Sequence, residues 1–180
     1  MSDILVYDDV INPDSMERIN NLFFNTDFPW FFAEKTAGNQ FDFEDTFEHF
    51  QFVHWFLNEH QVRSPYINFF ENILEDLPIR LDNITRAKAN FLPQVMHGKD
   101  EFNNPHIDSY EKHKICIVYL NDADGDTFIF NNDKKIIKRV SPKKGRVLIM
   151  DGNLIHTSSH PVESKYRVIL NINFQSSSFS

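Results

Sequence analysis

The sequence predicts an α+β fold in which a β-sandwich or barrel follows N-terminal helices. Two helix-start signals lie before residue 80, and six short apolar runs, most of them rich in Ile, Val, Tyr or Phe, follow residue 83. Turn clusters such as NDADGD and SPKKG separate those runs, and no comparable helix start lies among them. Several short strands at such spacing indicate a sandwich or barrel. A chain of 180 residues fits one domain, so we expect residues 1–180 to fold as a unit.

A short strand and an amphipathic helix are expected first. Residues 3–8 alternate apolar and polar side chains, which is typical of a strand. Asn12 and Pro13 fit a helix N-cap and the first helical position. Apolar side chains then recur at helical spacing, so we expect a helix over residues 13–25.

A second helix is expected near residue 65. Ser64 and Pro65 repeat the start signal, and apolar residues at helical spacing continue to residue 77. The stretch between the two helices, residues 27–60, holds Phe, Trp, acids and His without a clean period. We expect irregular structure there, with one strand near 50–57.

The strands that follow residue 83 form the expected core. They comprise residues 84–92, 114–120, 127–131, 135–140, 146–151 and 166–174. Thirteen of the nineteen Phe precede this region. Because aromatic side chains bury a large area each, we expect most of these Phe to cover the outer face of the sheet. We therefore divide the chain into helical and aromatic support, residues 1–83, and a catalytic core, residues 84–175.

Composition and charge exclude several classes of protein. The single Cys116 has no partner for a disulfide and cannot form a Cys-based zinc framework. No apolar run approaches the roughly 18 residues of a membrane span, and the start MSDILVYDDV lacks the basic region of a secretory signal. We therefore expect a cytoplasmic protein with no membrane partner. A formal net charge of −8 also disfavours nucleic acid as a partner.

His106 and Asp108 are the first candidate metal ligands. They stand two residues apart in NNPHIDSY, so in an extended segment their side chains point to the same side. His156 follows some fifty residues later, after the strand-like RVLIM and the turn DGN. Two imidazoles and one carboxylate can hold a metal from one face and leave coordination positions open, as in non-haem Fe(II) oxygenases. The alternative is that these His are polar surface or capping residues.

Arg167 strengthens the case for a site. It lies in YRVILNINF, where alternation puts Arg167, Ile169, Asn171 and Asn173 on one face and apolar side chains on the other. A strand that carries an Arg and two Asn inward lines a polar cavity. The planar guanidinium matches a carboxylate, which suits the far end of a dicarboxylate cosubstrate. The alternative, a solvent-facing sheet surface, is less favoured.

These motifs together resemble a known family. The resemblance rests on HID, on YLND followed by DGDTFIF, and on PKKGRVLIMDGNLIHTSSHPVESKYRVILNINF. It is to the 2-oxoglutarate/Fe(II)-dependent oxygenases of the prolyl 4-hydroxylase type, and in particular to small members from phage and bacterial genomes. It covers residues 84–175, with a weaker likeness near FPWFF. It implies a double-stranded β-helix (jelly-roll) core in a cytoplasmic enzyme of a bacterium or of a phage-infected host.

The resemblance also implies a cofactor set and a site. The enzyme would be a dioxygenase that uses Fe(II), 2-oxoglutarate as cosubstrate and O2. His106, Asp108 and His156 would hold the iron and form the catalytic centre. Arg167 would bind the distal carboxylate of 2-oxoglutarate.

Two further residues correspond to cosubstrate positions of the family, and others depart from its pattern. Tyr119 matches a position whose hydroxyl assists the same carboxylate, and Asn90 lies on a strand that contacts the cosubstrate. The family's Gly-Gly-Glu-Thr turn reads Asp-Gly-Asp-Thr here, and Asn173 replaces a common Trp. The resemblance therefore supports the type of reaction more strongly than the identity of the substrate.

The resemblance favours hydroxylation of a peptidyl prolyl or related substrate, with release of succinate and CO2. A small-molecule hydroxylase that acts on an amino acid or another metabolite is the main alternative. A nucleic-acid demethylase is disfavoured, although residues 134–146 carry seven basic residues and no acid. A non-catalytic jelly-roll binding module is also less favoured, because all four predicted iron and cosubstrate ligands are present.

Overall fold

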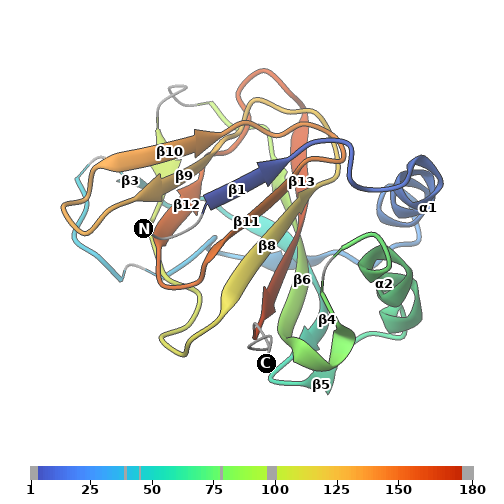
Figure 1. The fold of residues 1–180 in the computed structure, drawn as a ribbon. Helices are drawn as coiled ribbons and strands as arrows, with labels where there is room; N and C mark the ends of the chain where they lie inside the picture. The colour runs from blue at the N-terminus through green and yellow to red at the C-terminus, as the bar shows by residue number, and fades with distance from the viewer. Residues whose placement is uncertain (1–3, 39, 45, 78, 97–100, 176–180) are drawn as a thin grey trace.

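The computed structural model describes five stretches of the chain. They are residues 4–38, 40–44, 46–77, 79–96 and 101–175. Two helices lie in the first half of the chain, α1 (Pro13–Phe23) and α2 (Ile67–Leu74), followed by a 3-10 turn at Leu81–Asn83. Most of the remaining regular structure is β-strand (Figure 1).

Two main sheets carry the fold. The eight-stranded sheet has the order β1 (Ile4–Tyr7), β11 (Val147–Asp151), β8 (Lys114–Tyr119), β13 (Tyr166–Phe174), β6 (Ile84–Pro93), β4 (Gln51–Asn58) and β2 (Phe31–Ala33), with β5 (Gln61–Val62) beside β4. The three-stranded sheet has the order β10 (Ile136–Val140), β9 (Thr127–Phe130) and β12 (Ile155–Ser158). A small parallel pair joins β3 (Thr46–Phe47) to β7 (Phe102–Asn103).

The two main sheets pack face to face, and the helices cover the other side of the larger sheet (Figure 1). Apolar side chains of β9 and β10 share one buried cluster with β8, β11 and β13. A second cluster joins α1 and α2 to the opposite face of the large sheet. The expected α+β arrangement, with N-terminal helices against a sandwich of strands, is confirmed.

Helix α1 begins where the sequence predicts and ends two residues early. The Asn12 side chain accepts a hydrogen bond of 2.9 Å from the backbone N–H of Asp14, and Pro13 occupies the first turn. Met16, Ile19 and Phe23 form its buried face. After Phe23 the chain turns, so the predicted end at residue 25 is too late.

Helix α2 is shorter at both ends than its predicted span. The Ser64 hydroxyl accepts a hydrogen bond from the backbone N–H of Tyr66, which makes a turn before the helix begins at Ile67. The helix ends at Leu74, and residues 75–77 form a turn. Leu77 is nevertheless buried, so its apolar character reflects packing after the helix has ended.

The six strands predicted after residue 83 are all present within one or two residues. The strand β12, IHTS, which carries His156, was not predicted from the sequence. It is too short for a visible alternation, because it has only four residues between a turn and a second polar segment. The strand expected near 50–57 is confirmed as β4.

Residues before 84 supply strands as well as helices. β1, β2, β4 and β5 all belong to the large sheet, so this part of the chain extends the sheet that carries the site. Phe23, Phe56 and Phe70 are buried between the helices and the sheet, as expected. Phe32 on the edge strand β2 is 65% exposed and contacts the rings of Phe50 and Phe52, outside the core.

The two faces of β13 set the position of the site. Val168, Leu170 and Ile172 point into the helix-side cluster. Arg167 and Asn171 point to the opposite face, where they line a cavity between the two sheets. The alternation predicted for YRVILNINF is therefore confirmed. Its Arg enters the interior of the sandwich.

Candidate metal centre

His106 and His156 are held side by side by their own backbones. They form an isolated antiparallel bridge with two hydrogen bonds, from the N–H of His106 to the carbonyl of His156 at 2.9 Å and the reverse at 3.0 Å. The two ring centroids are 4.7 Å apart. The bridge joins the segment before β8 to β12, so residues fifty positions apart meet in the cavity.

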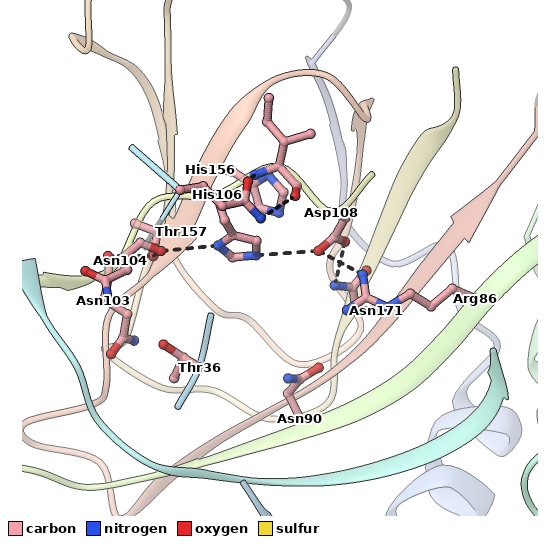
Figure 2. Close-up of polar contacts among 12 residues, drawn as sticks. Thr36, Arg86, Asn90, Asn103, Asn104, His106, Asp108, His156, Thr157 and Asn171 are labelled. Atoms are coloured by element: carbon pink, nitrogen blue, oxygen red, sulfur yellow. Dashed lines mark hydrogen bonds and ion pairs between the residues drawn. The ribbon is translucent and has the colours of Figure 1, made fainter. Parts of the chain in front are cut away.

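Asp108 completes the group two residues after His106 (Figure 2). Its carboxylate lies 3.5 Å from His106 Nε2, and ligand atoms of the three residues all lie within 4.8 Å of one another. Arg86 Nη1 contacts one carboxylate oxygen at 2.8 Å, and Asn171 Nδ2 donates to the other at 3.3 Å. The large sheet therefore fixes this carboxylate from β6 and β13.

Both imidazoles are oriented by backbone carbonyls. His106 Nδ1 lies 3.2 Å from the carbonyl oxygen of Asn104, and His156 Nδ1 lies 2.9 Å from that of Leu154. A proton on each Nδ1 makes these hydrogen bonds and leaves Nε2 with a free lone pair. Metal-binding His residues commonly show this arrangement, because the second nitrogen fixes the ring and its tautomer.

The site favours the protonation states that bind a metal. Burial, assisted by the nearby His106, lowers the pKa of His156 to about 4, so its imidazole is neutral at pH 7. Burial opposes ionisation of Asp108, but the contact with His106 and the charge of Arg86 outweigh it and hold the pKa of Asp108 well below its usual range. A neutral imidazole and a carboxylate are the forms that coordinate metal ions.

His106 and His156 border a narrow cavity of about 50 Å³, and Asp108 lies beside them outside its lining. Other residues that line it are Thr36, Gln51, Lys88, Asn90, Leu92, Ile117, Thr127, Thr157, Ser158, Arg167, Ile169 and Asn171. Figure 2 shows Asn90 and Thr36 across the cavity from the two imidazoles, and Arg86 and Asn171 beside Asp108. Of the residues predicted for the site, His106, His156, Arg167 and Asn90 line this cavity, whereas Tyr119 and Asp108 do not.

Arg167 lies at the other end of the cavity and has donors to spare. It is 1% exposed, and Nη2 donates to Thr127 Oγ1 at 2.9 Å. Its Nε and Nη1 are buried and have no hydrogen-bond partner among the described residues. A buried cation with unused donors requires an anion, since leaving such groups unpaired is costly. The guanidinium thus fits the distal carboxylate of 2-oxoglutarate.

Tyr119 supports the Arg167 end from behind. Its hydroxyl donates to Thr127 Oγ1 at 2.7 Å, so Thr127 links Tyr119 to Arg167. Asn90 lies in the middle of the cavity, where Nδ2 donates to Gln51 Oε1 at 2.6 Å and Oδ1 has no partner among the described residues.

Several residues of the site have little or no signal in the sequence. Thr127 and Gln51 lie in segments whose polar character looks ordinary, and Arg86 and Lys88 stand on a strand that reads as core. Only the period of two along β6, which places Lys88 and Asn90 on one face, points toward the cavity.

Comparison with known proteins agrees with this geometry. The model of the 2OG-Fe(II) oxygenase superfamily matches residues 93–175, which contain the His-Asp-His group and Arg167. The match covers just under half of the chain. Enzymes of this superfamily use Fe(II), 2-oxoglutarate and O2, and the His-Asp-His donor set of this chain fits the iron.

Solved structures show the same fold at low sequence identity. A 2OG-Fe(II) oxygenase from Burkholderia pseudomallei is 17% identical, with a TM-score of 0.70 over 97% of this chain and 84% of that one. A prolyl-4-hydroxylase from Pseudomonas putida is 13% identical, with a TM-score of 0.56 over 97% and 94%. A Trichoplax adhaerens prolyl hydroxylase, solved with a hypoxia inducible factor peptide, is 13% identical, with a TM-score of 0.58 over 96% and 83%. The predicted double-stranded β-helix is thereby confirmed.

No curated protein matches this chain. Among the described residues, no helix is long and apolar enough to cross a membrane.

Proposed function

We propose that this protein is a 2OG-Fe(II) oxygenase that hydroxylates a peptidyl prolyl or related substrate while 2-oxoglutarate is converted to succinate and CO2. The observation that carries the proposal is a single cavity with His106 and His156 of the His-Asp-His group at one end and Arg167, with unused donors, at the other. A chelating cosubstrate with a second carboxylate at its far end needs both features. The domain we assign to this activity is residues 1–180, with the catalytic core in 84–175 and support in 1–83.

The iron ligands we assign are His106, Asp108 and His156. Bound iron with 2-oxoglutarate supplies the activation of O2 that drives hydroxylation. The protein's own part is to hold these ligands in their metal-binding forms and to keep one side of the group open to the cavity. The charge of Arg86 helps to keep the carboxylate ionised, and Arg86 and Asn171 fix its direction at one edge of the site.

Arg167 is assigned to the distal carboxylate of 2-oxoglutarate. Its planar donors match a carboxylate in two parallel hydrogen bonds. Tyr119 acts through Thr127, which it holds in place beside the guanidinium. Asn90 offers its free side-chain oxygen to the middle of the cavity, where the cosubstrate chain would lie.

The prolyl substrate is supported by the prolyl hydroxylases among structures of this fold. The Trichoplax adhaerens enzyme was solved with a peptide. The second candidate, a small amino acid or metabolite, is supported by the narrow cavity and by a buried cation in it, Lys88.

The test begins with binding of the cosubstrate in the absence of air. Wild-type protein given Fe(II) and 2-oxoglutarate should develop the visible charge-transfer absorption of the chelate. Admission of air should then release succinate, and a library of prolyl peptides, free amino acids and other metabolites should show which class accelerates that release. Failure to develop the absorption would contradict the assignment of iron and cosubstrate.

Two variants check the assignment of the ligands. His106→Ala or Asp108→Ala should abolish iron-dependent succinate release, because two ligands no longer hold the metal firmly. The matched control Asp133→Ala removes an exposed carboxylate from a turn and should retain wild-type turnover. Full turnover in either ligand variant would show that the group is not the iron site.

A further inference from the structure

Lys88 is a buried cation inside the cavity that has no role in the chemistry described above. It is 9% exposed, and it lines the same cavity as His106, His156 and Arg167. Its ammonium lies 5.4 Å from the ring centroid of Trp55, on the neighbouring strand β4. Among the described residues, no carboxylate lies within ion-pair distance of this ammonium, and no residue forms a hydrogen bond with it.

The charges around Lys88 do not compensate it. The carboxylate that attracts the ammonium is Asp108, and its two oxygens are already engaged by Arg86 and Asn171. Arg86 stands two residues away on the same face of β6 and repels the ammonium. Burial and that repulsion outweigh the attraction of Asp108 and lower the pKa of Lys88 to about 7. An anion bound in the cavity would supply the missing partner.

The register of the sheet separates Lys88 from the anion site at Arg167. Lys88 pairs with Asn171 across β6 and β13, whereas Arg167 pairs with Leu92. Four residues along a strand span about 13 Å. Lys88 therefore lies at the metal end, next to the residue that contacts Asp108, and its outer neighbour is Trp55 on β4. A carboxylate held by Arg167 does not reach it.

We propose that Lys88 binds a carboxylate of the primary substrate, placed a few bonds from the carbon that is hydroxylated. This inference rests on the proposed function, because it takes the His-Asp-His group as the reacting centre. One uncompensated positive charge matches a carboxylate, while a phosphate dianion would bring surplus charge into a narrow cavity. The Trp55 ring, which the Arg86 guanidinium also approaches at 5.3 Å, lies against the ammonium and helps to hold it.

The carboxylate can come from two sources with the same chemistry. It can be the α-carboxylate of a free amino acid or another small acid, or the acidic side chain of a residue in a peptide. Matched probes distinguish the two. The first set is free L-amino acids against their amides. The second is blocked tripeptides with a central Pro flanked by Asp against the same tripeptides with Asn.

The experiment measures binding of these probes by calorimetry to Fe(II)-loaded protein with 2-oxoglutarate, without air. Wild-type protein should bind one acidic set at least tenfold more tightly than its neutral counterpart. Lys88→Met keeps the length of the side chain and removes its charge, so the preference should fall to about twofold or less. Lys88→Arg keeps the positive charge and should retain the preference for the acid. It provides a second test if the Lys88→Met variant fails to fold. Lys138→Met, a change at an exposed lysine of β10, should behave as wild type.

Three results would overturn the proposal. One is an acid preference that survives in Lys88→Met; another is the absence of any acid preference in the wild type. The third is a Lys88→Met variant whose affinity for 2-oxoglutarate falls tenfold while its acid preference remains, since Lys88 would then belong to the cosubstrate. A wild type without the chelate absorption would contradict the proposed function instead, and the comparison of acids with amides would still decide the role of Lys88.

Discussion

Arg167 shows how much a single buried side chain can reveal about a ligand. Its charge is enclosed by the sandwich, its pKa is lowered by burial, and two of its nitrogens lack partners among the described residues. Each unpaired buried donor lowers the stability of the fold by about 1–3 kcal/mol. A bound anion that accepts hydrogen bonds from these donors would remove this cost. The residue is therefore placed to bind an anion, and the shape of the cavity directs that anion toward the His-Asp-His group.

Replacing Arg167 should separate cosubstrate binding from iron binding. Arg167→Met removes the guanidinium, so the affinity for 2-oxoglutarate should fall by roughly 10- to 150-fold, the equivalent of 1.5–3 kcal/mol for a hydrogen bond to a charged group. Tyr119→Phe should weaken it less, up to about tenfold, because it loses only the hydrogen bond to Thr127. Anaerobic titration of the chelate absorption measures both.

The control for these variants is Arg80→Met, which removes an exposed guanidinium that pairs with Asp82. It should leave the titration unchanged. An affinity for 2-oxoglutarate that is unaltered in Arg167→Met would remove that residue from the cosubstrate site.

Some residues of the candidate site could be predicted from the sequence, and others could not. His106, Asp108, His156 and Arg167 carry recognisable chemistry in short motifs, so the sequence could propose them as site residues, and the first three lie together in the structure. Arg86 and Thr127 could not be found, because their roles depend on which strands become neighbours. Arg86 on β6 can contact Asp108 because β6 lies beside β13, whose Asn171 contacts the same carboxylate.

At the scale of elements, strand β13 contributes one face to the apolar core and the other face to the candidate site. Leu170 is fully buried against the helices, and the adjacent Asn171 turns to the cavity and donates to Asp108. The strand lies between β8 and β6, so both of its edges are paired. The sequence predicted this strand well, because its alternation is long and its two faces differ sharply in polarity.

Two neighbouring substitutions in β13 should have opposite consequences. Leu170→Ala leaves a cavity in the core and should lower the free energy of unfolding by about 2–5 kcal/mol while iron affinity stays near wild type. Asn171→Ala should cost about 1 kcal/mol in stability but weaken iron binding by roughly tenfold or more, since the carboxylate loses an orienting partner. Urea unfolding of chelator-treated protein and metal titration measure the two effects, and the reverse pattern would show that the faces of β13 have been misassigned.

Short elements were harder to predict than long ones. β12 has four residues and gives no periodic signal, yet it carries His156 and pairs with β9. Helix α2 began later than Ser64 because the serine hydroxyl first closes a turn. In both cases a local hydrogen bond or a tertiary pairing determined the structure, and neither leaves a pattern that can be read from spacing alone.

At the scale of the whole molecule, the His-Asp-His group links the two sheets of the sandwich. His156 belongs to the three-stranded sheet, and Asp108 is tied to β6 and β13 of the eight-stranded sheet. A metal held by both would connect the sheets in addition to their apolar packing. Its binding should therefore stabilise the global fold and not only a loop.

Metal binding should raise the melting temperature of the whole chain. A divalent ion at 100 times its dissociation constant adds about 2.7 kcal/mol, which corresponds to a shift of roughly 5–10 °C for a chain of this size. Ni²⁺ is suitable in air, because it binds such ligands more tightly than Fe²⁺ and does not turn over. Asp108→Asn should abolish the shift, and Asp133→Asn, at an exposed turn, should preserve it. A shift of equal size in both variants would mean that the ion stabilises the protein from another place, and the two sheets would then be held together by packing alone.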